Sequence, residues 1–197
     1  MKTCFWKGSN KKVDEDLRLV KEVLKGNLDS FNIIVNKYEV PILRFIYNII
    51  KNTQTAEDIT QDVFITVYNK LYLYKSEYKF SNWIFQIARN KCIDYVRKNK
   101  KTVEANIDEM RELASKEETP QELLEFKEMK EQVEKFLYSL EETDRQIILL
   151  RYSGENTTFN DIAQIMKISE SSVKRRYYNA REKFKKNISV QEKRCRG

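Results

Sequence analysis

The stretch that predicts the fold is TTFNDIAQIMKISESSVKRRYYNAREKFKK, residues 157–186, because its pattern indicates two helices separated by a tight turn. Thr158 is a suitable N-cap for the first helix, and Asp161 follows three residues later at the acceptor position of a capping box. Ser169 is a suitable cap for the second helix. The apolar positions of that second helix recur at helical spacing and predict its buried face: Val173, Tyr177, Ala180 and Phe184.

The opposite face of the second helix is polar and basic, with Ser171, Lys174, Arg175 and Tyr178 directed outward. A short buried helix, a turn and a longer basic helix form the layout of a helix-turn-helix, whose second helix lies in the DNA major groove. Lys167 occupies the turn position where glycine commonly supplies a positive φ, so we expect this lysine to adopt a mildly unfavourable backbone conformation.

Composition predicts a soluble, all-α protein. The chain has 197 residues and a net charge of +7, and only 4 glycines and 2 prolines, which disfavours a turn-rich β fold. Residues 89–101 and 174–186 are strongly basic, whereas acidic residues outnumber basic ones between residues 104 and 142. Two basic helices separated by an acidic segment predict a polyanionic partner that is contacted at two places.

The cysteine and histidine content argues against a zinc protein, a disulfide-stabilised protein and an enzyme. Cys4, Cys92 and Cys195 are far apart in sequence and the chain contains no histidine, so neither a zinc site nor a disulfide framework is expected. The absence of histidine also removes the commonest general base, and we expect no enzymatic activity and no metal or other cofactor. No segment has the length and apolarity of a signal peptide or a transmembrane helix, which predicts a cytoplasmic protein without membrane insertion.

The N-terminal half is predicted to contain four helices. The first begins near Asp14 and ends at Gly26. The second is expected to start at Asn27 or Asp29 and to run through Ile49, with Pro41 kinking or splitting it. The third, residues 56–74, is expected to start at a Thr55 cap and carries Glu57, Asp58, Gln61 and Asp62 outward near its N-terminus. These acids admit two interpretations, which are compensation of the helix dipole and a contact surface for another protein.

An aromatic stretch containing Tyr72, Tyr74, Tyr78 and Phe80 precedes a fourth helix, residues 81–101, capped by Ser81. The polar stripe of this helix becomes basic toward its end. Aromatic rings beside a basic helix are typical of single-stranded nucleic-acid sites, because unstacked bases lie on rings while cations contact phosphates. Aromatic residues at such spacing are also common in cores; Trp83 and Phe85 are assigned there, whereas Tyr74, Tyr78 and Phe80 are expected to be more exposed.

Two domains and a linker follow from these patterns. Residues 14–98 form the first helical domain, and residues 99–119, rich in charge without an apolar period, form a flexible acidic linker. A helix starts at Thr119–Pro120, a second covers residues 143–153, and with the helix-turn-helix they complete a domain over residues 120–187.

Three stretches in this order resemble the extracytoplasmic-function group of the bacterial sigma-70 family of RNA polymerase sigma factors. They are AEDITQDVF (56–64), FSNWIFQIARNKCIDYVRK (80–98) and residues 140–186, which begin LEETDRQIILLRY. The chain departs from the family pattern at Glu141, where proline is usual, and at Lys167, where glycine is usual. Both departures concern helix entry or turn geometry and therefore bear on the pitch of the second helix of the helix-turn-helix.

The resemblance implies a promoter-recognition subunit with three surfaces. The surface implied to dock on the clamp helices of the polymerase β′ subunit comprises Asp58, Gln61, Asp62 and Phe64. The surface implied to capture the −10 element as a separated strand comprises Tyr74, Tyr78, Phe80, Gln86, Asn90, Arg97 and Lys98. The surface implied to recognise the −35 duplex comprises Ser171, Lys174, Arg175, Arg176, Tyr178 and Arg181.

The partners implied by the resemblance are core RNA polymerase, promoter DNA and an anti-sigma factor, with no small-molecule substrate. A stand-alone helix-turn-helix regulator is the nearest alternative, although it leaves the aromatic stretch and the basic helix 81–101 without a role. A recombinase-like enzyme is a second alternative. It would need catalytic carboxylates beside the basic helices, where only Asp94 and Glu182 lie.

Overall fold

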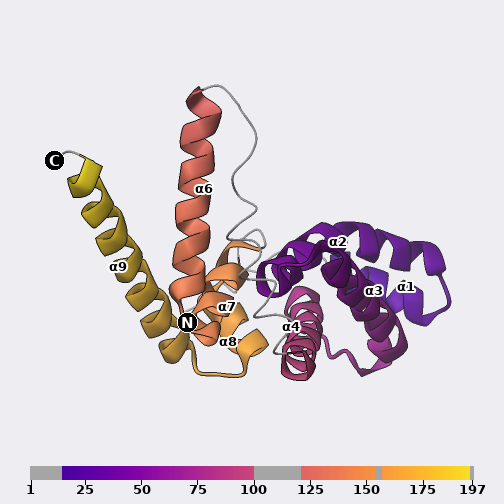
Figure 1. Cartoon of the computed structure of the whole chain (residues 1–197). Helices are drawn as coiled ribbons and strands as arrows, with labels where there is room; N and C mark the ends of the chain where they lie inside the picture. The colour runs from indigo at the N-terminus through magenta and orange to yellow at the C-terminus, as the bar shows by residue number, and fades with distance from the viewer. Residues whose placement is uncertain (1–14, 100–120, 154–156, 196–197) are drawn as a thin grey trace, which may run out of the picture.

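The computed structural model describes residues 15–99, 121–153 and 157–195, and within these ranges the chain is all-α, as predicted. Residues 100–120, which contain most of the predicted linker and the expected helix start at Thr119–Pro120, lie outside the described residues. The elements, shown in Figure 1, are α1 (Glu15–Leu24), α2 (Leu28–Ile50), α3 (Thr53–Lys70), the 3₁₀ helix η1 (Leu71–Leu73), α4 (Phe80–Lys98), α6 (Gln121–Ser139), α7 (Glu142–Tyr152), α8 (Phe159–Met166) and α9 (Glu170–Cys195).

The α1–α2 junction follows local sequence signals. Gly26 has a φ of 97°, a left-handed conformation that ends α1 at little steric cost. Asn27 caps α2, since its side-chain oxygen accepts hydrogen bonds from the backbone N–H groups of Asp29 (3.0 Å) and Ser30 (3.3 Å). Pro41 was expected to kink or split α2, and the split does not occur: one helix continues through Pro41, because Ile42 and the following apolar side chains are buried and hold it in place.

Two predicted helix starts are shifted. Asn52, not Thr55, caps α3, and its side-chain oxygen accepts a hydrogen bond from the backbone N–H of Thr55 at 2.9 Å. As a result the first turn of α3 contains no acidic residue. Dipole compensation therefore explains Asp58 and its neighbours poorly, because that effect falls off beyond the first turn. The other shift is in α4, which begins at Phe80 without a side-chain cap instead of being capped by Ser81.

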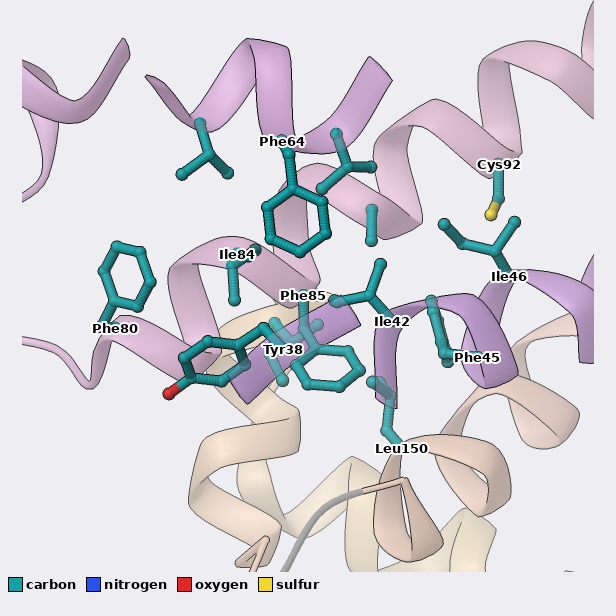
Figure 2. Close-up of a cluster of buried hydrophobic side chains, with 14 of the residues drawn as sticks. Tyr38, Ile42, Phe45, Ile46, Phe64, Phe80, Ile84, Phe85, Cys92 and Leu150 are labelled. Carbon is teal, nitrogen blue, oxygen red and sulfur yellow. The ribbon is translucent and has the colours of Figure 1, made fainter. Parts of the chain in front are cut away.

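The main hydrophobic core joins both halves of the chain. Buried side chains of α1–α4 form one cluster with residues of α7, α8 and α9. Figure 2 shows part of it, with Leu150 of α7 reaching toward Ile42 and Phe45 of α2. Cys92 of α4 is fully buried in this cluster. A smaller cluster holds α6 against α9 through Phe136, Leu140 and Ala180.

The helices are arranged as a body with two projecting arms. α1–α4 form the body, α8 packs against α4, and α7 contacts both α2 and α9. α6 and α9 extend away from this body (Figure 1). α9 continues to Cys195, beyond the predicted end of the second domain at residue 187.

Candidate nucleic-acid interface

The first helix of the predicted pair, α8, begins with the expected capping box. The backbone N–H of Asp161 donates to the hydroxyl of Thr158 at 3.1 Å, and the backbone N–H of Thr158 donates to the Asp161 carboxylate at 2.9 Å. Two N–H groups that would otherwise lack helical partners are thereby satisfied.

The turn between α8 and α9 is tight. Lys167 has a φ of 57° and a ψ of 43°, which confirms the left-handed conformation expected at this position. The backbone N–H of Ile168 donates to the carbonyl of Ala163 at 3.2 Å. Ser169 then accepts a hydrogen bond from the backbone N–H of Ser172 at 3.3 Å, as an N-cap does.

α9 carries its predicted polar face on the surface. Val173 and Ala180 are buried, so the opposite side of the helix faces outward. Arg176 is half-buried, and its guanidinium donates to Asp144 at 2.7 Å and to Glu141 at 3.5 Å, both in the segment that starts α7. This ion pair links α9 to the start of α7. The exposed members of the predicted −35 set are Ser171, Lys174, Arg175, Tyr178 and Arg181.

The aromatic residues around the start of α4 divide into exposed and buried members. Tyr78 is 52% exposed, but Phe80 is 0% exposed, so the expectation of an exposed Phe80 is wrong. Tyr74 is half-buried and its hydroxyl donates to the carbonyl of Tyr78 at 2.7 Å. The Phe80 ring contacts Tyr74 and Trp83, with ring centroids 5.3 and 5.7 Å apart. Phe80 thus supports the surface on which Tyr78 lies.

The polar stripe of α4 is accessible along most of its length. Asn90, Arg97 and Lys98 are exposed and Gln86 is half-buried. Among the described residues Arg97 pairs with Asp94 at 3.9 Å, and an exposed ion pair of this length can give way to a phosphate.

The acidic face of α3 is also accessible. Asp58, Gln61 and Asp62 are exposed, and Asp62 makes a long ion pair with Lys91 at 3.6 Å. Phe64 is only 7% exposed and lies in the core (Figure 2). The structure therefore brings three of the four predicted polymerase-contact residues to one surface and places the fourth beneath it.

A polar cluster joins α4 to α8. Lys79 Nζ donates to Asp161 Oδ2 at 2.8 Å, and Asn82 Nδ2 donates to Asp161 Oδ1 at 2.9 Å and to Gln164 Oε1 at 2.7 Å. Burial alone would raise the pKa of Asp161, but hydrogen bonds from Lys79, Asn82 and Thr158 outweigh it and lower the pKa to about 2. Asp161 is thus a charged acceptor shared by the capping box and the α4–α8 contact.

Sequence reasoning missed Lys79, Asn82 and Gln164. One local signal was present, because Asn82 lies three residues before the buried Phe85 and an amide on the inward side of a helix needs a buried partner. Its partners are about 80 positions away in sequence, at separations of 79 and 82 residues. A cavity of about 300 Å³ borders this contact and is lined by Tyr78, Asn82, Trp83, Gln86, Gln164 and Lys167.

The described part of the chain offers no group of three Cys, Asp or Glu side chains placed to hold a metal ion. Nor does any helix within the described ranges have the length and apolarity needed to cross a bilayer.

Comparison with known families and proteins agrees with the geometry. Residues 34–102 match the family described as Sigma-70 region 2, and residues 83–186 match a family described as a protein of unknown function, DUF722. The ECF RNA polymerase sigma factor SigW of Bacillus subtilis (strain 168) is 29% identical over 177 residues, which cover 86% of this chain and 94% of SigW.

The fold is also found in a solved structure of CnrH in complex with the cytosolic domain of CnrY. The TM-score is 0.67 at 20% sequence identity, and the match covers 90% of this chain and 99% of that one. The ECF RNA polymerase sigma factor SigM of Bacillus subtilis (strain 168) is 31% identical over 153 residues, which cover 77% of this chain and 91% of SigM. Because that similarity covers nearly the whole of SigM, this chain belongs to the extracytoplasmic-function (ECF) group of RNA polymerase sigma factors.

Proposed function

We propose that this sigma factor directs core RNA polymerase to its promoters by binding the −35 element as duplex with α9 and capturing a separated −10 strand along α4. The observation that carries the proposal is the exposed face of α9, where hydroxyl, lysine and arginine side chains project opposite the buried Val173 and Ala180. The function is that of a transcription initiation factor, and we place it in the cytoplasm with the polymerase.

The chemistry of α9 suits a major groove. Arg175 is exposed and can donate two hydrogen bonds to the O6 and N7 atoms of a guanine. Lys174 pairs with Glu170 of the same helix at 2.7 Å, and a phosphate can replace that exposed partner. Arg176, held by Asp144, is assigned to the phosphates, together with Arg181, which lies five residues further along the helix.

Replacing Arg175 by alanine is expected to cost about 1–3 kcal/mol of discrimination among −35 sequences, through loss of base contacts. The measurement is duplex binding by the holoenzyme to a panel of −35 variants. Lys185→Ala is the matched control, because it removes one positive charge from α9 at the groove facing α6, which Arg175 does not line. Equal, sequence-independent losses in both variants would show that Arg175 contacts only phosphates.

Strand capture is assigned to the surface around the start of α4. Tyr78 offers an exposed ring for stacking, and Gln86, Asn90, Arg97 and Lys98 continue the surface along the helix. Stacking contributes about 1–3 kcal/mol per base, which offsets much of the few kcal/mol that unpairing costs. Tyr74 and Phe80 are proposed to position Tyr78 from below, without contacting the DNA.

Polymerase contact is assigned to the exposed face of α3, with Asp58, Gln61 and Asp62 meeting the β′ clamp helices and Phe64 supporting them from the core. We assign residues 14–98 to the domain that binds polymerase and the −10 element, residues 99–119 to the linker, and residues 120–187 to the domain that binds the −35 element.

An anti-sigma factor is the proposed regulatory partner. An apolar groove of about 530 Å³ lies between α2, α6, α7 and α9, and Arg44, Arg181 and Lys185 are among its lining residues. Such a groove suits a partner helix with an apolar face and acidic flanks.

The proposal is tested by transcription in vitro with purified core polymerase, genomic template and mapped start sites. The full chain should bind core polymerase and produce transcripts that share −35 and −10 elements. The double variant Asp58→Ala, Asp62→Ala is the control, since it should lose polymerase binding while keeping the fold. A chain that binds duplex operators tightly alone and does not associate with core polymerase would instead be a stand-alone regulator.

A further inference from the structure

We propose that the apolar groove between α2, α6, α7 and α9 binds one small amphiphilic molecule, a free long-chain fatty acid. The groove has a volume of about 530 Å³, which lies within the range of small-molecule sites. The proposal goes beyond the proposed function, because this ligand is neither nucleic acid nor polymerase. A partner helix that uses the same groove would have to displace the fatty acid.

The interior of the groove is apolar and is built from packed side chains. Phe45 of α2 (Figure 2) is 1% exposed and Phe136 of α6 is 8% exposed, and both line the groove. Phe136 lies against Phe184 of α9, with ring centroids 4.8 Å apart. Ile148 and Leu149 of α7 add aliphatic side chains to the lining. Because these walls are held by their neighbours, an alkyl chain that enters the groove leaves water without a rearrangement of the core.

The charged lining of the groove is cationic. Arg44 contributes a guanidinium from α2, and Arg181 and Lys185 contribute cations from α9, whereas no Asp or Glu is among the described lining residues. Lys185 pairs with Glu182 at 2.9 Å, so we assign the anionic group of the ligand to Arg44 and Arg181. An uncharged ligand gains nothing from these guanidinium groups, and a cationic ligand is repelled by them.

Two tyrosine hydroxyls add hydrogen-bonding capacity beside the cations. Tyr152 Oη and Tyr177 Oη lie 3.2 Å apart, and both residues line the groove. Tyr177 precedes Arg181 by four residues on α9, so the two side chains are neighbours on one face of the helix. Since one hydroxyl donates to the other, the second can donate to a carboxylate oxygen. A carboxylate that accepts from arginine and tyrosine together favours a fatty acid over a long-chain alcohol.

The groove draws its walls from both halves of the chain. Phe45 and Arg44 come from α2, and Phe136, Ile148 and Arg181 come from α6, α7 and α9. A ligand that contacts all of these helices binds the folded chain and not the unfolded one. Bound fatty acid should therefore raise the melting temperature of the chain.

The test measures binding of cis-parinaric acid, a fluorescent long-chain fatty acid, to the full chain below the critical micelle concentration. Displacement by laurate, decanoate and dodecanol separates the effect of chain length from that of charge. Val133→Glu places a carboxylate at the groove, at a position that is 38% exposed and so accepts a polar side chain. Met129→Glu is the matched control, because Met129 lies one turn earlier on α6, is 64% exposed and is not among the described lining residues.

The wild-type chain should bind one equivalent of cis-parinaric acid saturably. Laurate should displace it at least about tenfold more effectively than decanoate, because two further methylenes leave water. Val133→Glu should weaken binding at least about tenfold through repulsion between carboxylates, and it should abolish the rise in melting temperature that laurate causes. Met129→Glu should change neither quantity.

The contribution of the charge is tested by Arg44→Ala, with the exposed Arg18→Ala of α1 as its control. Arg44→Ala should weaken displacement by laurate about threefold to fivefold and leave displacement by dodecanol unchanged. Non-saturable binding, equal effects of Val133→Glu and Met129→Glu, or equal displacement by laurate and dodecanol would overturn the proposal. A groove that accepts only a protein helix would bind no cis-parinaric acid below the critical micelle concentration, which would overturn it as well.

Discussion

Replacing Phe80 by alanine is expected to reduce the free energy of unfolding by about 3–5 kcal/mol, as for other fully buried aromatic residues. The side chain has no exposed surface. Its ring packs between α2 and α4, with centroid distances of 5.7 Å to Tyr38, 5.3 Å to Tyr74 and 5.7 Å to Trp83. Removing it leaves a cavity that three other rings cannot fill without shifting.

Tyr78→Ala is the matched comparison, because Tyr78 lies two residues away but is 52% exposed. Its removal should change stability by less than about 1 kcal/mol. The hydrogen bond that Tyr74 makes to the residue 78 carbonyl uses the backbone and is retained. In promoter-opening assays with holoenzyme, Tyr78→Ala should impair strand separation more than duplex binding. Urea denaturation measures the stability of each variant, and permanganate footprinting measures strand separation. Equal destabilisation by Phe80→Ala and Tyr78→Ala would contradict the assignment of Phe80 to the core and of Tyr78 to the DNA contact.

Replacing Asp161 by asparagine is expected to reduce stability at neutral pH by at most about 2 kcal/mol, and the loss should vanish in acid. The pKa of Asp161 is lowered from 3.8 to about 2 in the folded chain, so its ionised form stabilises the fold above pH 3.8. That contribution is lost as the pH falls through the folded pKa. The asparagine side chain keeps the shape but not the charge that accepts from Lys79, Asn82 and Thr158.

Urea denaturation of the wild-type and variant chains between pH 2 and pH 7 measures this contribution. The difference in free energy of unfolding should be constant above about pH 5 and shrink toward zero near pH 2. Asp94→Asn is the control, because Asp94 is exposed and its ion pair with Arg97 is 3.9 Å long. A difference that does not depend on pH would mean that the carboxylate charge contributes nothing.

The features that were predicted correctly depend on residues close in sequence. The capping box of Thr158 and Asp161, the left-handed Lys167 and the apolar face of α9 are all set within one or two helical turns. Of the four side chains predicted for that face, Val173 and Ala180 are buried and Tyr177 and Phe184 are half-buried. Local chemistry alone decides these features, so a sequence pattern is enough to find them. The exposed basic face of α9 follows directly, because burial of Val173 and Ala180 fixes the opposite side.

The features that were missed depend on distant partners. Phe80 was expected on the surface because it follows an aromatic and polar stretch, yet Tyr38 of α2 helps to bury it. Pro41 does not divide α2, because packing along the buried face compensates for the missing N–H. The α4–α8 contact joins residues about 80 positions apart, and no periodic pattern in either helix indicates that the two would meet.

The buried thiol of Cys92 has a consequence for redox chemistry. Burial, followed by the nearby charge of Glu142, raises its pKa to about 12, so at neutral pH the sulfur is protonated and shielded from solvent. Because only the thiolate reacts readily with oxidants and alkylating reagents, this sulfur stays inert while α4 remains packed. An oxidant therefore does not react directly with Cys92 in the folded chain. The rate at which iodoacetamide labels this thiol would report how often the helical body unfolds.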